Sequence, residues 1–170
     1  MYVIGLHGDR ATPEMLRRDM GDLESILDCA FDAHGWKRYR RYFDKLVSEI
    51  KSLQEPPLML GYSRGVSVIA ALSELVELKG AILYEGAILN SWGVGGTFPV
   101  LQIWNDQGVR YGPNRRRREK AEESIVVWSR HHPVSTLIGV GRHFNTNPLG
   151  HAWDVQLNAQ ISEWIRTSCQ

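Results

Sequence analysis

Short apolar runs alternate along the chain with segments in which apolar residues recur every three or four positions. The runs have the length of buried strands. They cover residues 2–6, 25–31, 58–60, 81–84, 98–104 and 134–140. Helical spacing is found at about 12–23, 36–53, 66–76, 114–130 and 154–167, and loops are expected at 32–35 and 86–96. The pattern therefore predicts strands and helices in alternation.

Start and stop signals support two of these helices. Thr12-Pro13-Glu14 is typical of a helix start, with a capping hydroxyl, a proline in the first turn and an acidic residue near the positive end of the helix dipole. The helix at 36–53 has apolar residues on one side, and Pro56-Pro57 prevents its continuation.

Alternating strands and helices favour a parallel sheet covered on both faces. We therefore expect an α/β fold, a three-layer α/β/α sandwich around a mostly parallel sheet of about six strands. The length of 170 residues fits a single domain over 1–170, and no repeat or linker interrupts the pattern.

The composition narrows the function. Twenty Lys and Arg against nineteen Asp and Glu leave a formal charge of +1, which gives no field for steering toward nucleic acid or a membrane surface. No apolar run is long enough to span a bilayer, and residues 1–6 do not resemble a secretory signal. The two cysteines, Cys29 and Cys169, are expected to be free thiols in a reducing compartment, so we expect a cytoplasmic protein. The oligomeric state is not indicated.

The sequence lacks the motifs that bind several common cofactors and metals. No Cys and His cluster has metal-ligand spacing, and neither a P-loop nor a dinucleotide-binding glycine turn occurs. We therefore expect no metal and no cofactor. The run Arg115 to Arg118 is interpreted as a solvated surface patch, with an anionic substrate or partner as the alternative.

One motif carries a chemical prediction. Gly61-Tyr62-Ser63-Arg64-Gly65 fits G-x-S-x-G and lies directly between an expected strand and an expected helix. In this motif the chain turns so sharply that the serine backbone is strained and its hydroxyl is exposed above the sheet. The glycines are needed because a side chain at either position would collide with neighbouring backbone. The alternative is a purely structural role, in which the segment is a glycine-rich turn and the serine caps the helix.

Further polar residues follow other strands. His7-Gly8 ends the first strand, Asp106 follows the fifth, and Gly150-His151 precedes the last helix. With Ser63, this succession resembles the α/β-hydrolase superfamily, in particular its small uncapped esterases of the carboxylesterase/phospholipase and dienelactone-hydrolase kinds. The resemblance covers nearly the whole chain. It implies a minimal α/β-hydrolase without a lid domain, because the chain starts at the strand that carries His-Gly.

The resemblance also implies a Ser-His-Asp triad. Asp106 occupies the position of the acid, although Ile103 stands where a glycine is usual, and Glu85 is the alternative acid. His151 is preferred as the base because Trp164 follows thirteen residues later, a spacing similar to that of the carboxylesterase-like branch. His143, soon after the sixth strand, is the alternative base.

The remaining site residues follow from the same mechanism. The backbone N–H groups of Arg64 and Asp9 are expected to bind the oxyanion. Tyr62, Trp92 and Trp153 are candidate walls of a substrate pocket, and His7 is expected to shape the first turn through a hydrogen bond.

Three functional hypotheses remain at this stage. The first is a serine hydrolase that cleaves a carboxylic ester or thioester through an acyl-enzyme and needs only this small-molecule substrate as its partner. The second is a catalytically inactive binding module with a hydrolase fold. The third is an acyltransferase that uses the same triad with an acceptor other than water.

Overall fold

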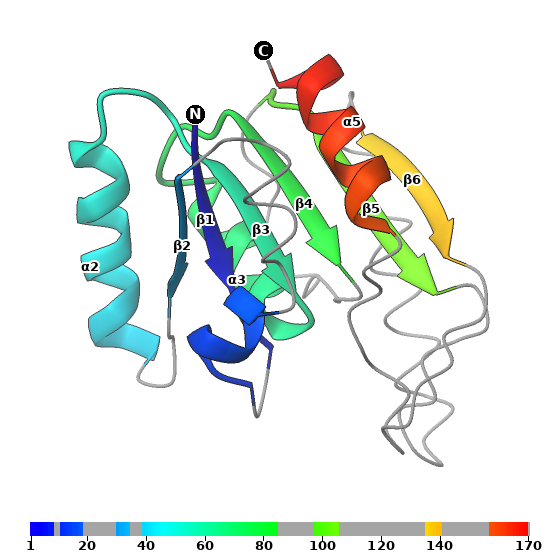
Figure 1. Cartoon of the computed structure of the whole chain (residues 1–170). Coiled ribbons are helices and arrows are strands. Elements are labelled where there is room, and N and C mark those ends of the chain that lie inside the picture. Colours follow the sequence, from blue (N-terminus) through cyan, green and yellow to red (C-terminus); the bar gives the residue numbers. More distant parts are fainter. Residues whose placement is uncertain are drawn as a thin grey trace.

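The computed structural model describes residues 1–8, 11–18, 30–34, 39–84, 97–105, 135–140 and 157–169. Six strands and four helical segments lie in these ranges (Figure 1). In chain order they are β1 (Tyr2–Leu6), a short helix at 13–18, β2 (Ala30–His34), α2 (Tyr39–Ser52), β3 (Leu58–Tyr62), α3 (Arg64–Leu72), β4 (Gly80–Tyr84), β5 (Val100–Asn105), β6 (Ser135–Val140) and α5 (Asn158–Ser168).

The strands form one parallel sheet in the order β2-β1-β3-β4-β5-β6. β1 lies between β2 and β3, with Tyr2 opposite Ala30 and Val3 opposite Leu58. The predicted parallel sheet of about six strands is therefore confirmed. Because all neighbouring strands run in the same direction, their carboxyl ends meet at one edge, where ligands of such sheets bind.

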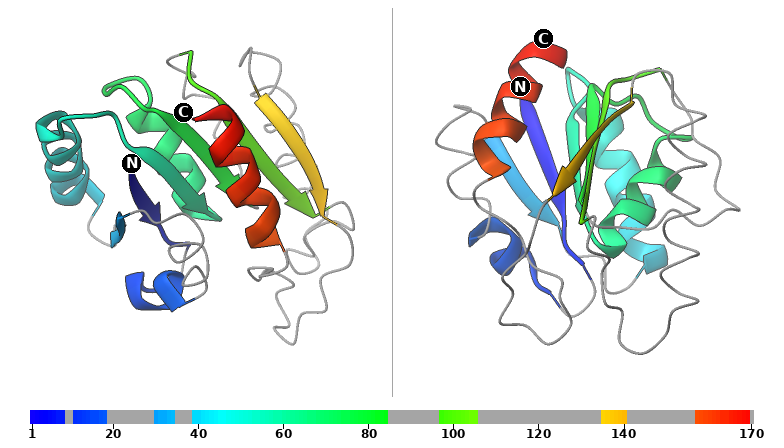
Figure 2. Two further views of the ribbon diagram at one scale, coloured as in Figure 1. Left: turned by 45° about the horizontal axis from the view of Figure 1, so that its top comes forward. Right: turned by 90° about the vertical axis from the view of Figure 1, so that its right-hand side faces the viewer.

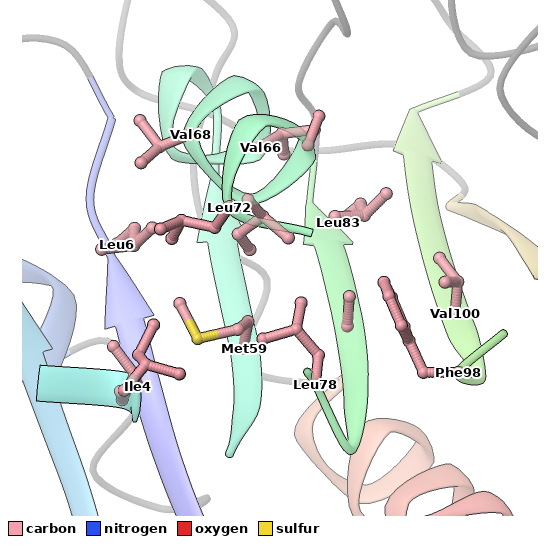
Figure 3. Close-up of a cluster of buried hydrophobic side chains, with 14 of the residues drawn as sticks. Ile4, Leu6, Met59, Val66, Val68, Leu72, Leu78, Leu83, Phe98 and Val100 are labelled. Carbon is pink, nitrogen blue, oxygen red and sulfur yellow. The ribbon is translucent and has the colours of Figure 1, made fainter. Parts of the chain in front are cut away.

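Helices cover both faces of the sheet, as the three-layer prediction requires (Figure 2). α2 and α3 lie on one face, and α5 and the helix at 13–18 lie on the other. Side chains of β4 alternate between the two cores: Ile82 and Tyr84 pack on the α5 side, and Ala81 and Leu83 on the α3 side. Figure 3 shows the α3 side, where apolar side chains of α3 meet those of β1, β3 and β4.

The prediction for β2 was wrong in its position. A strand was expected at 25–31 and a loop at 32–35, whereas the strand covers Ala30–His34 and pairs with β1 along its whole length. Residues 25–29 lie outside the described ranges. In the sequence of this strand, Phe31 and Ala33 alternate with polar Asp32 and His34.

The limits of α3 also differ from the prediction of 66–76. The helix begins at Arg64 and ends at Leu72. The Ser73 hydroxyl donates a hydrogen bond to the carbonyl of Ala70 (2.8 Å), and the N–H groups of both Leu75 and Val76 bond to the carbonyl of Leu72 (2.8 and 3.0 Å). The chain therefore continues in turns after Leu72 and enters the sheet again at Gly80.

The other predicted elements within the described ranges are confirmed with small shifts at their ends. Thr12 caps the helix at 13–18, since its Oγ1 accepts a hydrogen bond from the Met15 N–H (3.3 Å). Residues 86–96 and the helix predicted at 114–130 lie outside these ranges. Within the described part of the chain, every helix is too short or too polar to span a bilayer.

Candidate active site

Ser63 lies at the carboxyl edge of the sheet, between the end of β3 and the start of α3. Its backbone has φ 55° and ψ −114°, and among the described residues no other non-glycine residue has a positive φ. Its N–H donates to the Tyr84 carbonyl at the end of β4 (2.8 Å), and its carbonyl accepts from the Val66 N–H (3.2 Å). The strained turn predicted from G-x-S-x-G is present, held on both sides by backbone hydrogen bonds.

The two motif glycines are needed for steric reasons. A Cβ at Gly61 would lie 2.7 Å from the Val66 nitrogen and 2.8 Å from the Gly65 carbonyl carbon. A Cβ at Gly65 would overlap the carbonyl oxygen of Leu6. At Gly61 the close approach is between residues of the turn itself. At Gly65 it is between the start of α3 and the end of β1. Both obstacles are backbone atoms, so no side-chain rotation can remove them.

The turn after β1 lies directly against Ser63. A Cβ at Gly8 would be 2.8 Å from Ser63 Cβ and 3.3 Å from its Oγ. His7 is only 1% exposed, and its Nδ1 lies 2.7 Å from the Gly8 carbonyl oxygen. The hydrogen bond predicted for His7 is therefore confirmed.

Two tyrosines lie beside Ser63. The ring centroids of Tyr62 and Tyr84 are 5.7 Å apart, with the rings tilted by 57°. Tyr84 is fully buried in the α5-side core, and Tyr62 is half-buried and packs against that core. Tyr62 thus lies next to Ser63 on the α5 side.

The electrostatic environment favours negative charge near Ser63. The amino end of α3 begins at the next residue, where the helix dipole is positive. The side chain of Arg64 is exposed there. On the helix at 13–18, the pKa of Glu14 is lowered mainly by a hydrogen bond from the Thr12 hydroxyl.

Cys169 belongs to the other end of the molecule. Its sulfur lies 2.8 Å from where a Cβ would be at Gly80, the first residue of β4. Burial raises the pKa of this free thiol to about 11, against a smaller opposing effect of Lys79. No group of three or more His, Cys, Asp or Glu side chains within the described ranges is placed to hold a metal ion.

The other predicted site residues lie outside the described ranges and remain predictions: Asp9, Glu85, Trp92, Asp106, His143, His151, Trp153 and the run Arg115 to Arg118. Their places in the sequence are nevertheless informative. Glu85 follows the last residue of β4, Asp106 the last residue of β5, and His143 comes three residues after β6. These strands end at the same edge as β3.

Two features of the site were missed in the sequence. One is the close contact of Gly8 with Ser63, which the position of a glycine directly after His7 could have indicated. The other is the Tyr84 carbonyl as the acceptor for the Ser63 N–H. That contact has no side-chain signal, since it depends on β3 and β4 being neighbours in register, with Tyr62 opposite Tyr84.

Comparison with solved structures identifies the fold. The chain is similar to a protein from Xanthomonas campestris assigned to the α/β superfamily of hydrolases, with 14% identity, a TM-score of 0.67 and 98% of each chain covered. It is also similar to a carboxylesterase from Bacillus cereus (16% identity, TM-score 0.63, 98% of this chain and 88% of that one). A monoacylglycerol lipase from Paleococcus ferrophilus gives 11% identity and a TM-score of 0.67, with 98% and 94% covered.

The chain therefore has the α/β-hydrolase fold, as the sequence resemblance implied. No protein-family model matches the sequence, and no curated protein is similar enough to match it. The likeness thus rests on the three-dimensional arrangement.

Proposed function

We propose that the protein is a serine hydrolase that cleaves a carboxylic ester or thioester through an acyl-enzyme. The observation that carries this proposal is the conformation of Ser63 at the carboxyl edge of the sheet, with φ 55° between β3 and α3. A strained serine of this kind costs stability and persists where the surrounding structure holds it, which is typical of functional sites. Several solved proteins with this fold are named as esterases or lipases.

In the proposed reaction, Ser63 Oγ attacks the carbonyl carbon of the substrate while a histidine takes its proton. The tetrahedral oxyanion is bound by the backbone N–H groups of Arg64 and Asp9, and its collapse expels the alcohol or thiol, which receives the proton from the histidine. Water then attacks the acyl-enzyme in the same way and releases the acid. The α3 dipole adds favourable electrostatics for the oxyanion.

His151 is the proposed base and Asp106 the proposed acid that orients it. His143 and Glu85 are the alternatives in these roles. Trp92 and Trp153 are proposed to line the substrate pocket, together with Tyr62, whose half-buried ring lies beside Ser63. A small-molecule ester or thioester is the partner that this arrangement needs.

Labelling with a fluorophosphonate probe tests the nucleophile. Attack of the serine oxygen on phosphorus with loss of fluoride should label the wild-type protein and not Ser63→Ala. Ser48→Ala is the matched control, because this exposed serine on α2 bonds only locally, to the carbonyl of Asp44. Labelling that persists in Ser63→Ala, or is absent in the wild type, contradicts the proposal.

The base is tested by hydrolysis of p-nitrophenyl butyrate. His151→Ala is expected to lower kcat by a factor of about 10⁴ or more, as loss of a triad member does, while His143→Ala retains most of it. The reverse result would assign the base to His143. Product analysis with a competing alcohol separates hydrolysis from acyl transfer, since a transferase would form the new ester in preference to the acid.

A further inference from the structure

A pocket lies at the edge of the sheet where the strands begin, the edge opposite to Ser63. It has a volume of about 610 Å³ and is lined by residues 73–79, which connect α3 to β4, together with Pro56, Thr97 and Phe98. These lining residues directly precede β3, β4 and β5. The volume is within the range of about 300 to 1,000 Å³ that is typical of small-molecule sites.

The walls of this pocket are held by backbone hydrogen bonds. The N–H of Lys79 donates to the carbonyl of Pro57 (2.9 Å), which ties the end of the α3–β4 connection to the start of β3. The N–H of Ala81 donates to the carbonyl of Pro99 (3.0 Å), which ties β4 to the segment before β5. The pocket is therefore formed before a ligand arrives, and binding costs little in ordering of the chain.

The pocket has an apolar floor and an apolar rim. Leu78 and Phe98 are each 7% exposed and belong to the α3-side core, which closes the pocket from below (Figure 3). Leu75 lines the same pocket and is 50% exposed, an unusual amount for a large apolar side chain. A ligand with an apolar body would remove this surface from water.

The polar groups of the wall are mainly hydrogen-bond acceptors. The N–H groups of Leu75 and Val76 already donate to the Leu72 carbonyl. Ser73 is 6% exposed, and its hydroxyl gives its single hydrogen to the Ala70 carbonyl (2.8 Å). The Ser73 oxygen can therefore only accept a further hydrogen bond. A ligand with N–H groups fits such a wall better than a ligand with acceptors.

The charges at the pocket favour a cation. Glu74 and Glu77 line it with exposed carboxylates, and α3 ends at Leu72, where its dipole is negative. Lys79 is the opposing charge among the lining residues, and it also acts on the Cys169 thiol, which packs in the α5-side core. Two carboxylates and a helix end outweigh one ammonium group.

We propose that this pocket binds a small organic cation, a protonated amine joined to an apolar body. The ammonium group would lie toward Glu74 and Glu77, and the body would cover Leu75 above the floor of Leu78 and Phe98. The pocket holds one small molecule, whereas a specific protein interface buries about 1,200 Å² or more. This inference does not depend on the proposed function, because the pocket and Ser63 lie at opposite edges of the sheet.

Monodansylcadaverine is a suitable probe, since it joins a fluorescent aromatic body to a primary amine. Fluorescence titration at low salt is expected to show saturable binding with a Kd below about 1 mM. The N-acetyl derivative has no charge and is expected to bind at least about threefold more weakly. A peptide, acetyl-Gly-Gly-Lys-Gly-Gly-amide, presents the same ammonium group without the apolar body and is expected to bind more weakly than the probe.

Variants with matched controls locate the contacts. Glu74→Gln combined with Glu77→Gln is expected to raise the Kd about three- to twentyfold, and Glu163→Gln, an exposed change on α5, should leave it unchanged. Leu75→Ser is expected to raise the Kd about three- to tenfold. Its control is Met15→Ser, because Met15 is 42% exposed on the helix at 13–18. All four positions are exposed, so the variants are expected to fold.

Amide shifts in a ¹H–¹⁵N spectrum complete the test. Probe binding should move the signals of residues 73–79, 97 and 98, also in protein whose Ser63 has been blocked with fluorophosphonate. Several results overturn the proposal: no saturable binding below about 1 mM, equal affinity for the N-acetyl derivative, or shifts confined to the turn at Ser63. Unchanged affinity in the pocket variants, or a peptide that binds as tightly as the probe, does so as well. A protein that fluorophosphonate does not label contradicts the proposed function and leaves this test intact.

Discussion

Gly65→Ala is the sharpest test of how the candidate site is held. The added Cβ would overlap the Leu6 carbonyl oxygen and lie 2.9 Å from the Leu6 carbonyl carbon. Gly65 does not have a positive φ, so the expected loss of stability comes from steric overlap alone. Both obstacles are backbone atoms of β1, which is fixed in the sheet between β2 and β3. The start of α3 must therefore move away from β1.

The expected cost combines two opposing effects. Forcing a methyl group into a packed site costs about 3 kcal/mol at the upper end of the usual range, which applies because backbone cannot rotate away. Replacing glycine by alanine inside a helix returns about 1 kcal/mol. The net loss of about 2 kcal/mol in the free energy of unfolding corresponds to a melting temperature about 4 to 8 °C lower for a chain of this size.

Gly80→Ala is the matched control. Its Cβ would meet the Sγ of Cys169 (2.8 Å) and the Cδ1 of Leu58 (2.9 Å), which are ends of side chains that can adjust. This variant is at the opposite end of β4 from the site and should label with fluorophosphonate at the wild-type rate. Gly65→Ala should label at least about tenfold more slowly, because the Ser63 turn moves with α3. A Gly65→Ala protein with unchanged melting temperature and labelling rate would refute the reasoning.

Three other predictions follow from described contacts. Gly8→Ala is expected to slow fluorophosphonate labelling by about tenfold or more, since its Cβ would press on Ser63; an unchanged rate contradicts the close contact. Thr12→Val is expected to raise the pKa of Glu14, measured by NMR titration, because it removes the hydroxyl that chiefly lowers it; an unmoved titration speaks against that hydrogen bond. The free energy of unfolding should fall between pH 9 and 11, by at most about 1.4 kcal/mol per pH unit from Cys169, whose folded pKa of about 11 lies above its ordinary value of 9.0. The protonated thiol favours the folded state, so this contribution is complete below pH 9 and is lost progressively as the pH rises from 9 to 11. In Cys169→Ala, the free energy of unfolding, measured by urea titration at each pH, should fall less steeply with pH. An identical pH dependence would exclude the thiol as its cause.

The sequence predicted the central elements well because burial there leaves a strong pattern. β3 and β4 are apolar almost throughout, as strands buried on both faces must be. β2 was misplaced because polar Asp32 and His34 lie within it, whereas the residues directly before it are more apolar and therefore favoured the earlier position. The predicted helix at 66–76 was too long at its end because Leu75 and Val76 continue the apolar spacing, whereas α3 ends at Leu72.

Of the candidate site, the part that depends on local chain geometry was predictable. Two glycines around a serine between a strand and a helix require a sharp turn, and the positive φ of Ser63 agrees with that. The contact of Gly8 with Ser63 and the hydrogen bond from Ser63 to Tyr84 depend on which strands are neighbours. A single sequence gives the direction of the strands but not their order, so these contacts could not be derived.

The bond between the Ser63 N–H and the Tyr84 carbonyl has a consequence for divergence of the sequence. The position of Ser63 is set by main-chain atoms of β1, β3, β4 and α3, and main-chain atoms do not depend on the side chain. Apart from the glycines of the turn, the side chains around Ser63 can therefore be replaced without moving Ser63. A turn built this way tolerates extensive change of the surrounding side chains, just as the fold itself is shared with solved structures at 11 to 16% identity.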